Sequence, residues 1–369
     1  MNVKLTKIGH RPDYFLIAVI FLLTVFGLLM LASASSDLGK IKFNDSYYYI
    51  KHQILYGLLV GLAGFFLGTI IHYQRLKRWS FPLLLLSIAA LVLVFSHYGF
   101  SVKNANRWLQ LGPLTFQPAE ILKFTYILYL AAWLSNTKMQ RIKNLSEGVI
   151  PFALISGLIA SLLILQPATS TMVILLTSGL VIYFMSGAEL KYLFAIVLIG
   201  AIALALVIYV TPYRKTRVLS FLNIGQNTEN QNYHLNQALI AIGSGGLWGA
   251  GYGQSATKAT YLPTPIDDSI FAVIAEELGF VGSAALITLL AVLVFRLYWL
   301  AKNMRDLFGK LLLIGFGTIV ALQSFVHIAA NIGLIPLTGV PLPFISYGGT
   351  ALAVFLTMSG VSINVSKYA

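Results

Sequence analysis

Carboxylates inside an apolar segment are the side chains of this sequence that most directly indicate chemistry. The segment TYLPTPIDDSIFAVIAEELGF (260–280) holds Asp267, Asp268, Glu276 and Glu277, although the whole chain has only 12 Asp and Glu residues. Ionisable groups within a membrane segment are costly, usually face a bundle interior or a wet cavity, and indicate a functional site. A carboxylate there could act as a general base, and it could equally titrate during ion-coupled transport.

The four acids differ in their expected positions. Asp267 and Asp268 come at the start of the apolar run, where one carboxylate can cap a helix, although capping does not readily explain two. Glu276 follows Asp268 by about two helical turns, so we expect it near the same face, about 12 Å deeper. Glu277 is expected to point the opposite way. For both glutamates, bonding to polar groups inside the bundle is favoured over catalysis.

Basic residues form a second candidate group. Glu120 and Lys123 lie three apart at the start of an apolar run, so they can form an ion pair instead of contacting a ligand. Arg214 and Arg217 in YRKTR are also three apart, and on a helix they would face the same way. Together with Arg107 they suggest an anionic partner outside the cytoplasm, such as an anionic leaving group or a lipid headgroup.

Composition places these groups in a membrane protein. The chain has 369 residues, 58% of them hydrophobic and 10% charged, which is too apolar for a soluble globule. Ten apolar runs approach the length that crosses a hydrocarbon core of about 30 Å; they are 14–33, 54–71, 81–95, 119–134, 149–165, 171–185, 192–209, 269–295, 307–334 and 348–362. We predict an all-α polytopic membrane protein with ten transmembrane helices, folded as a single transmembrane domain over 1–369. The first run is expected to be a retained span rather than a removable signal peptide.

The distribution of the 25 Lys and Arg residues predicts the orientation. Fifteen fall in connections on the side of the N-terminus and five in short connections on the other side, which is the positive-inside pattern. Both termini are then cytoplasmic, and 211–268 is a large extracytoplasmic loop between helices 7 and 8. The same distribution argues against a nucleic-acid partner, despite the net charge of +13.

Two extracytoplasmic stretches are unusual. Residues 236–242 are expected to form a short interfacial helix, and the glycine cluster 243–253 after it could cradle phosphate or form a flexible loop on the bilayer. The stretch 336–349 is too broken by Pro and Gly to span and too apolar for open water. Such backbone persists at membrane depth only where protein or a wet cavity surrounds it.

Five ordered motifs resemble the SEDS family (shape, elongation, division and sporulation). LPTPIDDSIFAVIAEELGFVG is similar to the family's LPE-x-HTDFIFAV-x-EE-x-G-x-x-G signature, and NANRWLQLGPLTFQPAEILK to its RRW…QPSE-x-x-K segment. YRKTR, LIAIGSGGLWGAGYGQS and GLIPLTGVPLPFISYGGT resemble its Y-R-x-x-R, SGG-x-x-G-x-G and LPxTGxPLPFxSYGG motifs. Several motifs in order along nearly the whole chain are far more specific than one short pattern.

The resemblance implies ten transmembrane helices and a peptidoglycan glycosyltransferase that polymerises lipid II and releases undecaprenyl pyrophosphate. It implies a bacterial plasma-membrane location with an extracytoplasmic active site. The implied partners are a class B penicillin-binding protein as transpeptidase and other membrane proteins of the division or elongation complex. The family's essential Asp falls on Asp268, the expected base for the acceptor sugar hydroxyl, and Ser346 and Tyr347 of the last motif are expected to support the site. The candidates to hold the diphosphate leaving group, which arginine can bind in a bidentate manner, are Arg107, Lys123, Arg214 and Arg217.

The sequence also departs from the family. Ile266 and Asp267 replace its His and Thr, and Ala168 replaces an Asp, so any pairing or metal role of that Asp is in doubt. A divalent cation, Mg²⁺ or Mn²⁺, could help the Arg and Lys side chains to neutralise the diphosphate, and Asp267 is a conceivable ligand of such a cation. SASS (33–36) and DSYYYIKHQI (45–54) resemble the division branch, the FtsW proteins, more than the RodA branch.

Two other function classes remain open. A lipid II flippase or ion-coupled carrier would use titrating acids within the membrane, and it predicts polar residues in both halves of the spans. The clearest intramembrane charges gather toward the outer half, which favours chemistry there. A scaffold that only recruits the transpeptidase would not need Asp268 or the outer cations.

Overall fold

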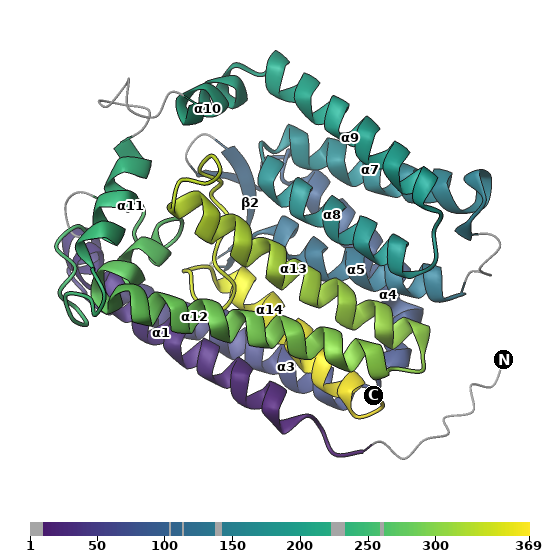
Figure 1. Cartoon of the computed structure of the whole chain (residues 1–369), viewed down its shortest axis with the longest axis horizontal. Helices are drawn as coiled ribbons and strands as arrows, with labels where there is room; N and C mark the ends of the chain where they lie inside the picture. The colour runs from purple at the N-terminus through teal and green to yellow at the C-terminus, as the bar shows by residue number, and fades with distance from the viewer. Residues whose placement is uncertain (1–9, 103–104, 113, 137–141, 223–232, 259–261) are drawn as a thin grey trace.

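The protein is a bundle of helices in the computed structural model (Figure 1). The structure describes residues 10–102, 105–112, 114–136, 142–222, 233–258 and 262–369. Within these residues each of the ten apolar runs forms most or all of a helix. The prediction of an all-α polytopic membrane protein is therefore confirmed.

Long apolar helices make up the first half of the chain. They begin and end where the sequence provides caps and breaks; Asp13, for example, accepts a hydrogen bond from Leu16 N at 2.9 Å and caps the first helix. The elements are α1 Tyr14–Phe43, α2 Tyr48–His52, the π-helix η1 Gln53–Leu58, α3 Leu59–Ile70, α4 Tyr73–Leu93, α5 Pro118–Asn136, the π-helix η2 Leu145–Val149, α7 Ile150–Leu165 and α8 Thr169–Met185.

The second half contains the long connection and the most buried helices. Two short helices, α10 Pro212–Leu222 and α11 Tyr233–Ser244, lie within the predicted loop 211–268, and α11 contains the expected short helix 236–242. The remaining elements are α9 Leu190–Val210, α12 Ile270–Asn303, α13 Leu307–Asn331 and α14 Gly349–Ser366.

Eight helical stretches of the described chain are long and apolar enough to cross a membrane. The two other runs correspond to α8, which has 17 residues, and to α5, whose first turns carry Glu120 and Lys123. The count of ten spans therefore stays a prediction.

The core of the bundle lies around α13 and α14. The small residues of α3 let it approach α14 closely: a Cβ added at Gly61 would lie 2.6 Å from Leu356, and one added at Gly68 would lie 2.8 Å from Val361 N. Such close contacts through small residues are typical of helix packing in membranes. The periphery is different, because α9 has no buried residue and lies at the outside of the bundle (Figure 1).

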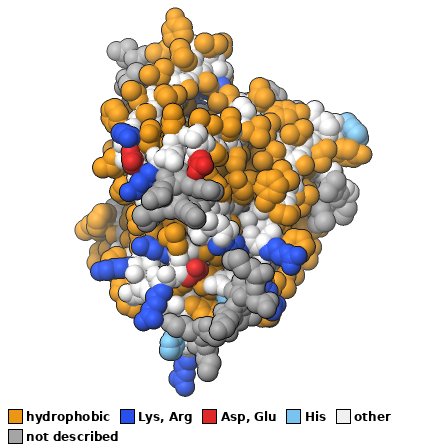
Figure 2. All heavy atoms as spheres, turned by 90° about the vertical axis from the view of Figure 1, so that its right-hand side faces the viewer, with side chains coloured by type: hydrophobic (Ala, Val, Ile, Leu, Met, Phe, Trp, Pro, Cys, Tyr) orange, Lys and Arg blue, Asp and Glu red, His pale blue; other side chains and the backbone are white. Residues whose placement is uncertain are grey.

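The two ends of the bundle differ in charge. The start of α1 and the C-terminus lie at one end, and α10, α11 and β2 lie at the other (Figure 1). Figure 2 faces the end with the termini, where Lys and Arg side chains gather; those in the helices and turns there include Arg75, Lys77, Arg78, Lys302, Arg305 and Lys310. This separation agrees with the charge distribution expected from the sequence. Five other basic residues of that prediction, Lys4, Lys7, Lys103, Lys138 and Arg141, lie outside the described residues.

A small sheet replaces part of the expected connection between α4 and α5. Its antiparallel strands, in the order β1-β2-β3, are β1 Gly99–Val102, β2 Ala105–Leu111 and β3 Leu114–Phe116. The sequence analysis expected no strand there. The central strand β2 carries Arg107, so the sheet gives this cation a fixed position.

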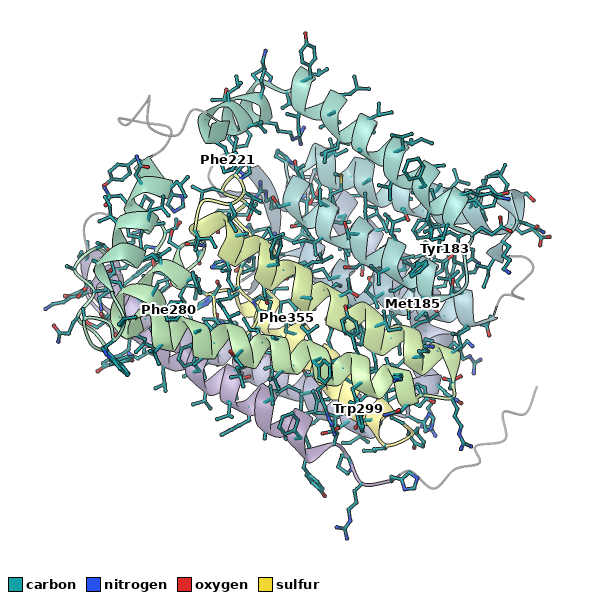
Figure 3. All side chains as sticks on the ribbon, in the orientation of Figure 1. Tyr183, Met185, Phe221, Phe280, Trp299 and Phe355 are labelled. Carbon is teal, nitrogen blue, oxygen red and sulfur yellow. The ribbon has the colours of Figure 1, made fainter. Side chains whose placement is uncertain are left out.

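The apolar run that holds the glutamates is not one continuous helix, which corrects the expected span 269–295. Gly279 has φ 67° and ψ −164°, so α12 breaks there into a short buried segment and a longer helix. A Cβ at Gly279 would lie 2.4 Å from Gly249 N. Figure 3 shows Phe280 and Trp299 toward opposite ends of the longer segment. Glu276 and Glu277 thus lie in the short segment, next to the break.

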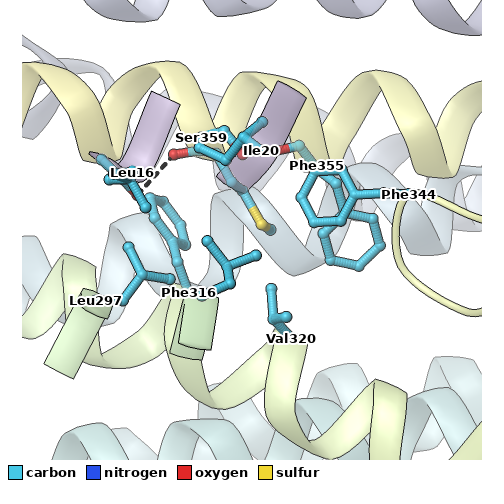
Figure 4. Close-up of a pocket in the computed structure, with 11 residues that line it drawn as sticks. Leu16, Ile20, Leu297, Phe316, Val320, Phe344, Phe355 and Ser359 are labelled. Atoms are coloured by element: carbon cyan, nitrogen blue, oxygen red, sulfur yellow. Dashed lines mark hydrogen bonds between the residues drawn. The ribbon is translucent and has the colours of Figure 1, made fainter. Parts of the chain in front are cut away.

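A small apolar cavity lies between α1, α12, α13 and α14 (Figure 4). Its volume is about 10 Å³, and Leu16, Phe316, Val320 and Phe355 are among its lining residues. Its polar lining residues, Ser359 and Ser362, donate their hydroxyls to carbonyls of α14. The cavity is far too small for a substrate, so the site must lie elsewhere.

We predict that Gly279→Ala destabilises the protein, because a side chain with this φ is strained by about 1–3 kcal/mol and would also collide with the 243–253 loop. The unfolding midpoint of the purified protein in detergent, followed by tryptophan fluorescence, should fall. Gly157→Ala in α7 is the matched control, since no atom lies within 4 Å of its added Cβ. An equal midpoint for both variants would contradict the account of the break.

Candidate active site

The segment around Asp268 is joined by hydrogen bonds to the connection between α13 and α14. Ser346 Oγ donates to Asp267 O at 2.9 Å and accepts from Leu342 N at 2.8 Å. Tyr347 N donates to Ile266 O at 2.9 Å. These bonds satisfy main-chain groups of two irregular segments that lipid could not satisfy. Ser346 and Tyr347, expected to support the site, thus hold the backbone on which both aspartates sit.

Asp268 is fixed through its main chain, and its carboxylate is left open. Its carbonyl accepts a hydrogen bond from Asn331 Nδ2 at 2.9 Å. The carboxylate lies beside Gly339, where an added Cβ would be 3.6 Å from Oδ2. The side chain is half-buried and accepts no hydrogen bond from the described residues. A carboxylate in this state has lone pairs available for a substrate hydroxyl.

Arg107 lies close enough to Asp268 for their charges to interact. Its Nε donates to Gln166 O at 3.2 Å, and Nη2 donates to Pro167 O. Burial lowers the pKa of Arg107, the charge of Arg217 lowers it further, and the charge of Asp268 raises it. Gln166 and Pro167, whose carbonyls bind the Arg107 guanidinium, directly precede Ala168. Main-chain oxygens therefore hold this cation next to the position at which the family motif has an Asp.

Arg217 is the more accessible cation of this region. It is exposed on α10, and its guanidinium lies 4.9 Å from the ring centroid of Tyr213, to whose hydroxyl it also donates a hydrogen bond. A cation over an aromatic face keeps its charge and its remaining donors. Arg217 and Arg107 together make the neighbourhood of Asp268 positive.

Arg214 has a different role from the one predicted. Its guanidinium donates to Thr169 Oγ1 at 2.9 Å, Thr211 Oγ1 at 3.0 Å and Ile164 O at 2.8 Å. These bonds attach α10 to the turn between α7 and α8. The expected joint grip of Arg214 and Arg217 on a diphosphate is therefore not supported, because every nitrogen of the Arg214 guanidinium already donates to the protein.

Lys123 also differs from the prediction of a diphosphate ligand. Its side chain is fully buried, with Nζ 2.6 Å from Glu120 Oε1 and 2.7 Å from Gln323 Oε1. Gln323 Nε2 in turn donates to Pro341 O at 2.7 Å. The alternative interpretation, an ion pair with Glu120, is the one the contacts support, and the pair links α5 through α13 to the α13–α14 connection.

Glu277 forms a buried ion pair that the sequence analysis did not identify. Lys258 Nζ lies 3.0 Å from Glu277 Oε1, and Ser33 Oγ of α1 donates to the same carboxylate at 2.6 Å. Both side chains are almost completely buried. A buried charge is tolerated when it is paired and hydrogen-bonded, so this group joins α1, α12 and the long connection.

Glu276 holds the chain that follows the glycine cluster. Its carboxylate accepts from Ala256 N at 3.0 Å, Thr257 N at 3.3 Å and the hydroxyl of Ser255. Within the cluster 243–253, Ala250 N donates to Glu276 O at 2.9 Å. The cluster is thus bonded to α12 rather than lying loose on a bilayer, and the contacts of both glutamates agree with the structural interpretation.

His327 contacts the connection between α13 and α14. It is buried in α13, and its Nδ1 lies 2.7 Å from Val340 O. Asn331, one turn further on, carries the bond to Asp268 O. The sequence analysis missed Gln323 and Asn331 as site residues, although polar side chains in an otherwise apolar span were a signal for them.

A metal role for Asp267 finds little support in its surroundings. Among the described residues no group of three or more His, Cys, Asp or Glu could hold a metal ion. Asp267 instead lies close to tyrosines: burial raises the pKa of Tyr347, and the charge of Asp267 raises it further. The two neighbouring carboxylates therefore have different surroundings, and we derive no step through a metal.

Known proteins match the chain over almost its whole length. The family model of the FtsW, RodA and SpoVE cell cycle proteins matches residues 13–369. The chain belongs to this family. It is 35% identical to stage V sporulation protein E of Bacillus subtilis over 97% of each chain, and 36% identical to the probable peptidoglycan glycosyltransferase FtsW of the same species over 99% of this chain and 93% of the relative.

Solved structures of the FtsW/RodA/SpoVE family have the same fold. RodA of Thermus thermophilus has a TM-score of 0.71 and 29% identity, covering 96% of each chain. A structure described as the coordination of polymerization and crosslinking by a peptidoglycan synthase complex has a TM-score of 0.77 and 27% identity, covering 96% of this chain and 97% of the other. The protein is thus a multi-pass membrane protein of this family, as the five motifs predicted.

We predict that Lys123→Met is strongly destabilising, because it leaves the Glu120 carboxylate buried without its cation, at a cost of about 3–5 kcal/mol. The double variant Glu120→Gln with Lys123→Met should recover much of that loss in the unfolding midpoint. If the double variant is no more stable than Lys123→Met alone, the ion pair is not what makes Lys123 necessary.

Proposed function

We propose that the protein is a peptidoglycan glycosyltransferase that polymerises lipid II and releases undecaprenyl pyrophosphate. The observation that carries the proposal is the Asp268 carboxylate, half-buried and without a hydrogen-bond donor among the described residues, near the cation Arg107, whose charge also interacts with that of Arg217. That combination suits a base acting next to an anionic leaving group. Relatives named probable peptidoglycan glycosyltransferase support the same reaction.

In the proposed reaction Asp268 accepts the proton of the sugar 4-hydroxyl on an acceptor lipid II. The hydroxyl oxygen attacks the anomeric carbon of the lipid-linked donor glycan as the bond from that carbon to the diphosphate oxygen breaks. The α-linked donor becomes a β-linked polymer in one inverting displacement. One base is sufficient, and no covalent sugar intermediate forms.

Arg107 and Arg217 neutralise the charge that develops on the diphosphate. Arg107 is held by two carbonyls, which leaves Nη1 without a partner among the described residues. Arg217 is exposed and backed by the Tyr213 ring. Arginine donors that are already oriented lose little freedom when they bind a phosphate, so they stabilise the departing diphosphate at low entropic cost.

The site is proposed to lie on the extracytoplasmic side of a bacterial plasma membrane. Arg107, Asp268 and Arg217 belong to connections at the end of the bundle opposite the termini, and the basic end with the termini is the expected cytoplasmic side. We place the reaction in septal synthesis because 33–36 and 45–54 resemble the division branch. A class B penicillin-binding protein is the proposed transpeptidase partner, since the neighbouring structure is that of a peptidoglycan synthase complex.

The structure gives the carrier alternative less support. The buried charges Glu120, Lys123, Lys258 and Glu277 are paired in contacts that join helices and loops. Transport by titrating acids needs groups that can change partners as the protein moves. Asp268, the open carboxylate, lies at one end of the bundle rather than along a path through it.

Polymerisation of purified lipid II separates the function classes. The full chain, alone and with a class B penicillin-binding protein, should yield long glycan strands on a gel, and a muramidase should cleave them. A flippase would instead move fluorescent lipid II between vesicle leaflets without making polymer. Absence of polymer under both conditions, together with such movement, would overturn the proposal.

Asp268→Asn is expected to lower polymerisation by at least roughly a hundredfold, because it keeps the shape of the side chain and removes the proton acceptor. The unfolding midpoint should stay near that of the wild type, since Asn331 bonds the main-chain carbonyl of Asp268 rather than its carboxylate. Polymer of wild-type length and yield from this variant would remove Asp268 from the reaction.

Arg217→Lys tests whether the diphosphate is held by directed bonds. Loss of a charge-assisted contact costs roughly 1.5–3 kcal/mol, so we expect a roughly ten- to hundredfold fall in polymerisation efficiency for both Arg217→Lys and Arg217→Ala. Lys215→Ala, a neighbouring exposed cation of α10, is the control and should retain activity. If Arg217→Lys polymerises as the wild type does and only Arg217→Ala fails, a positive charge at this position is sufficient and directed bonds to the diphosphate are not needed.

A further inference from the structure

A row of aromatic side chains on α2 and η1 is not used by the proposed reaction. Tyr48, His52 and Tyr56 are spaced four apart, so they lie along one helix face. Their rings follow one another, with 6.4 Å between the centroids of Tyr48 and His52 and 4.5 Å between those of His52 and Tyr56. All three are half-buried, so part of each ring is accessible.

This row is connected to the segment that carries the aspartates. The Tyr347 hydroxyl lies 2.9 Å from His52 Nδ1, and the Tyr347 ring centroid lies 5.8 Å from that of His52. Tyr347 N donates to Ile266 O at 2.9 Å, directly before Asp267. We call Tyr48, His52, Tyr56 and Tyr347 the aromatic track. It begins on α2, directly after α1, and through the bond from Tyr347 N to Ile266 O it reaches the backbone two residues before Asp268.

Asp267 and Asp268 lie next to groups of different chemical character. Asp268 faces the side of Arg107 and Gly339, and Asp267 lies near the tyrosines of the track. The charged leaving group of the donor fits the side with the cations. The track has the opposite character: it offers aromatic faces, hydroxyl groups, an imidazole and a neighbouring carboxylate, and none of its four side chains carries a fixed positive charge.

We propose that the aromatic track binds the sugar rings of the acceptor lipid II. The axial C–H groups of a pyranose carry partial positive charge and lie well on the negative face of an aromatic ring, while its hydroxyls need polar partners at the ring edge. An interfacial belt of tyrosines that contacts lipid headgroups is the other use of such residues. The track differs from a belt because the hydroxyl of Tyr347 is turned to His52 within the protein, next to the expected reacting group.

The inference rests on the proposed function for the identity of the sugar, so its test uses binding rather than polymerisation. The probe is a soluble tetrasaccharide of alternating N-acetylglucosamine and N-acetylmuramic acid, titrated into the detergent-purified full chain by calorimetry. The wild type should bind it. Tyr48→Ala and Tyr56→Ala should each weaken binding by roughly three- to tenfold, the range expected for loss of one ring contact.

Matched variants separate ring contact from folding and from general surface effects. Tyr48→Phe and Tyr56→Phe keep the ring and should bind within twofold of the wild type, and all four variants should keep its unfolding midpoint. Tyr14→Ala removes a tyrosine that is 64% exposed at the other end of α1 and should not change binding. In polymerisation assays Tyr48→Ala should raise the lipid II concentration needed for half-maximal rate and leave the maximal rate nearly unchanged.

The outcomes are distinguishable. No tetrasaccharide binding by the wild type, or equal affinity for the wild type and both Ala variants, would overturn the aromatic track as a sugar site. Weaker attachment of Tyr48→Ala to lipid nanodiscs with unchanged sugar affinity would identify an interfacial belt instead. Sugar binding with the predicted pattern in a protein that makes no polymer would retain the track and reject the proposed polymerase.

Discussion

The structure depends on supplying hydrogen-bond partners to main-chain groups that lie outside helices and close to lipid. The segment 262–269 and the connection between α13 and α14 are not helical, so their main-chain groups need partners from the protein. Ser346, Tyr347 and Asn331 supply them beside the aspartates, and Gln323 binds Pro341 O. Other buried polar side chains, such as Ser178 and Ser359, instead donate to carbonyls of their own helix.

The same constraint explains why so many charges of the chain do no chemistry. Glu120 and Lys123 link α5 to α13, and Glu277 and Lys258 join α1 to the long connection. A buried pair is weak evidence for net stability, but removal of one partner is severe, so such pairs fix the helices in one arrangement. Against this background the Asp268 carboxylate, which accepts no hydrogen bond from the described residues, is where a substrate can act.

Much of the fold was predictable because apolar runs of sufficient length must form helices in a membrane. The importance of Asp268 was also predictable, because a carboxylate in such a run is energetically costly and therefore indicates a function. The break at Gly279 was not predictable, because Gly282 in the same run offers the same local freedom and only the approach of Gly249 decides which of the two is used. The partners of Arg214 and Lys258 depend on which segments meet in space, and residue spacing along the chain carries no information on that.

The central claim is that the Asp268 carboxylate removes the proton of the acceptor hydroxyl. Chemical rescue of Asp268→Ala tests it most directly, because the space left by the side chain borders Gly339 and could admit a small anion. Lipid II polymerisation by this variant should be very slow, and it should rise with added formate but not with chloride at equal ionic strength. Polymerisation by Asp268→Ala at the wild-type rate without formate would contradict the account.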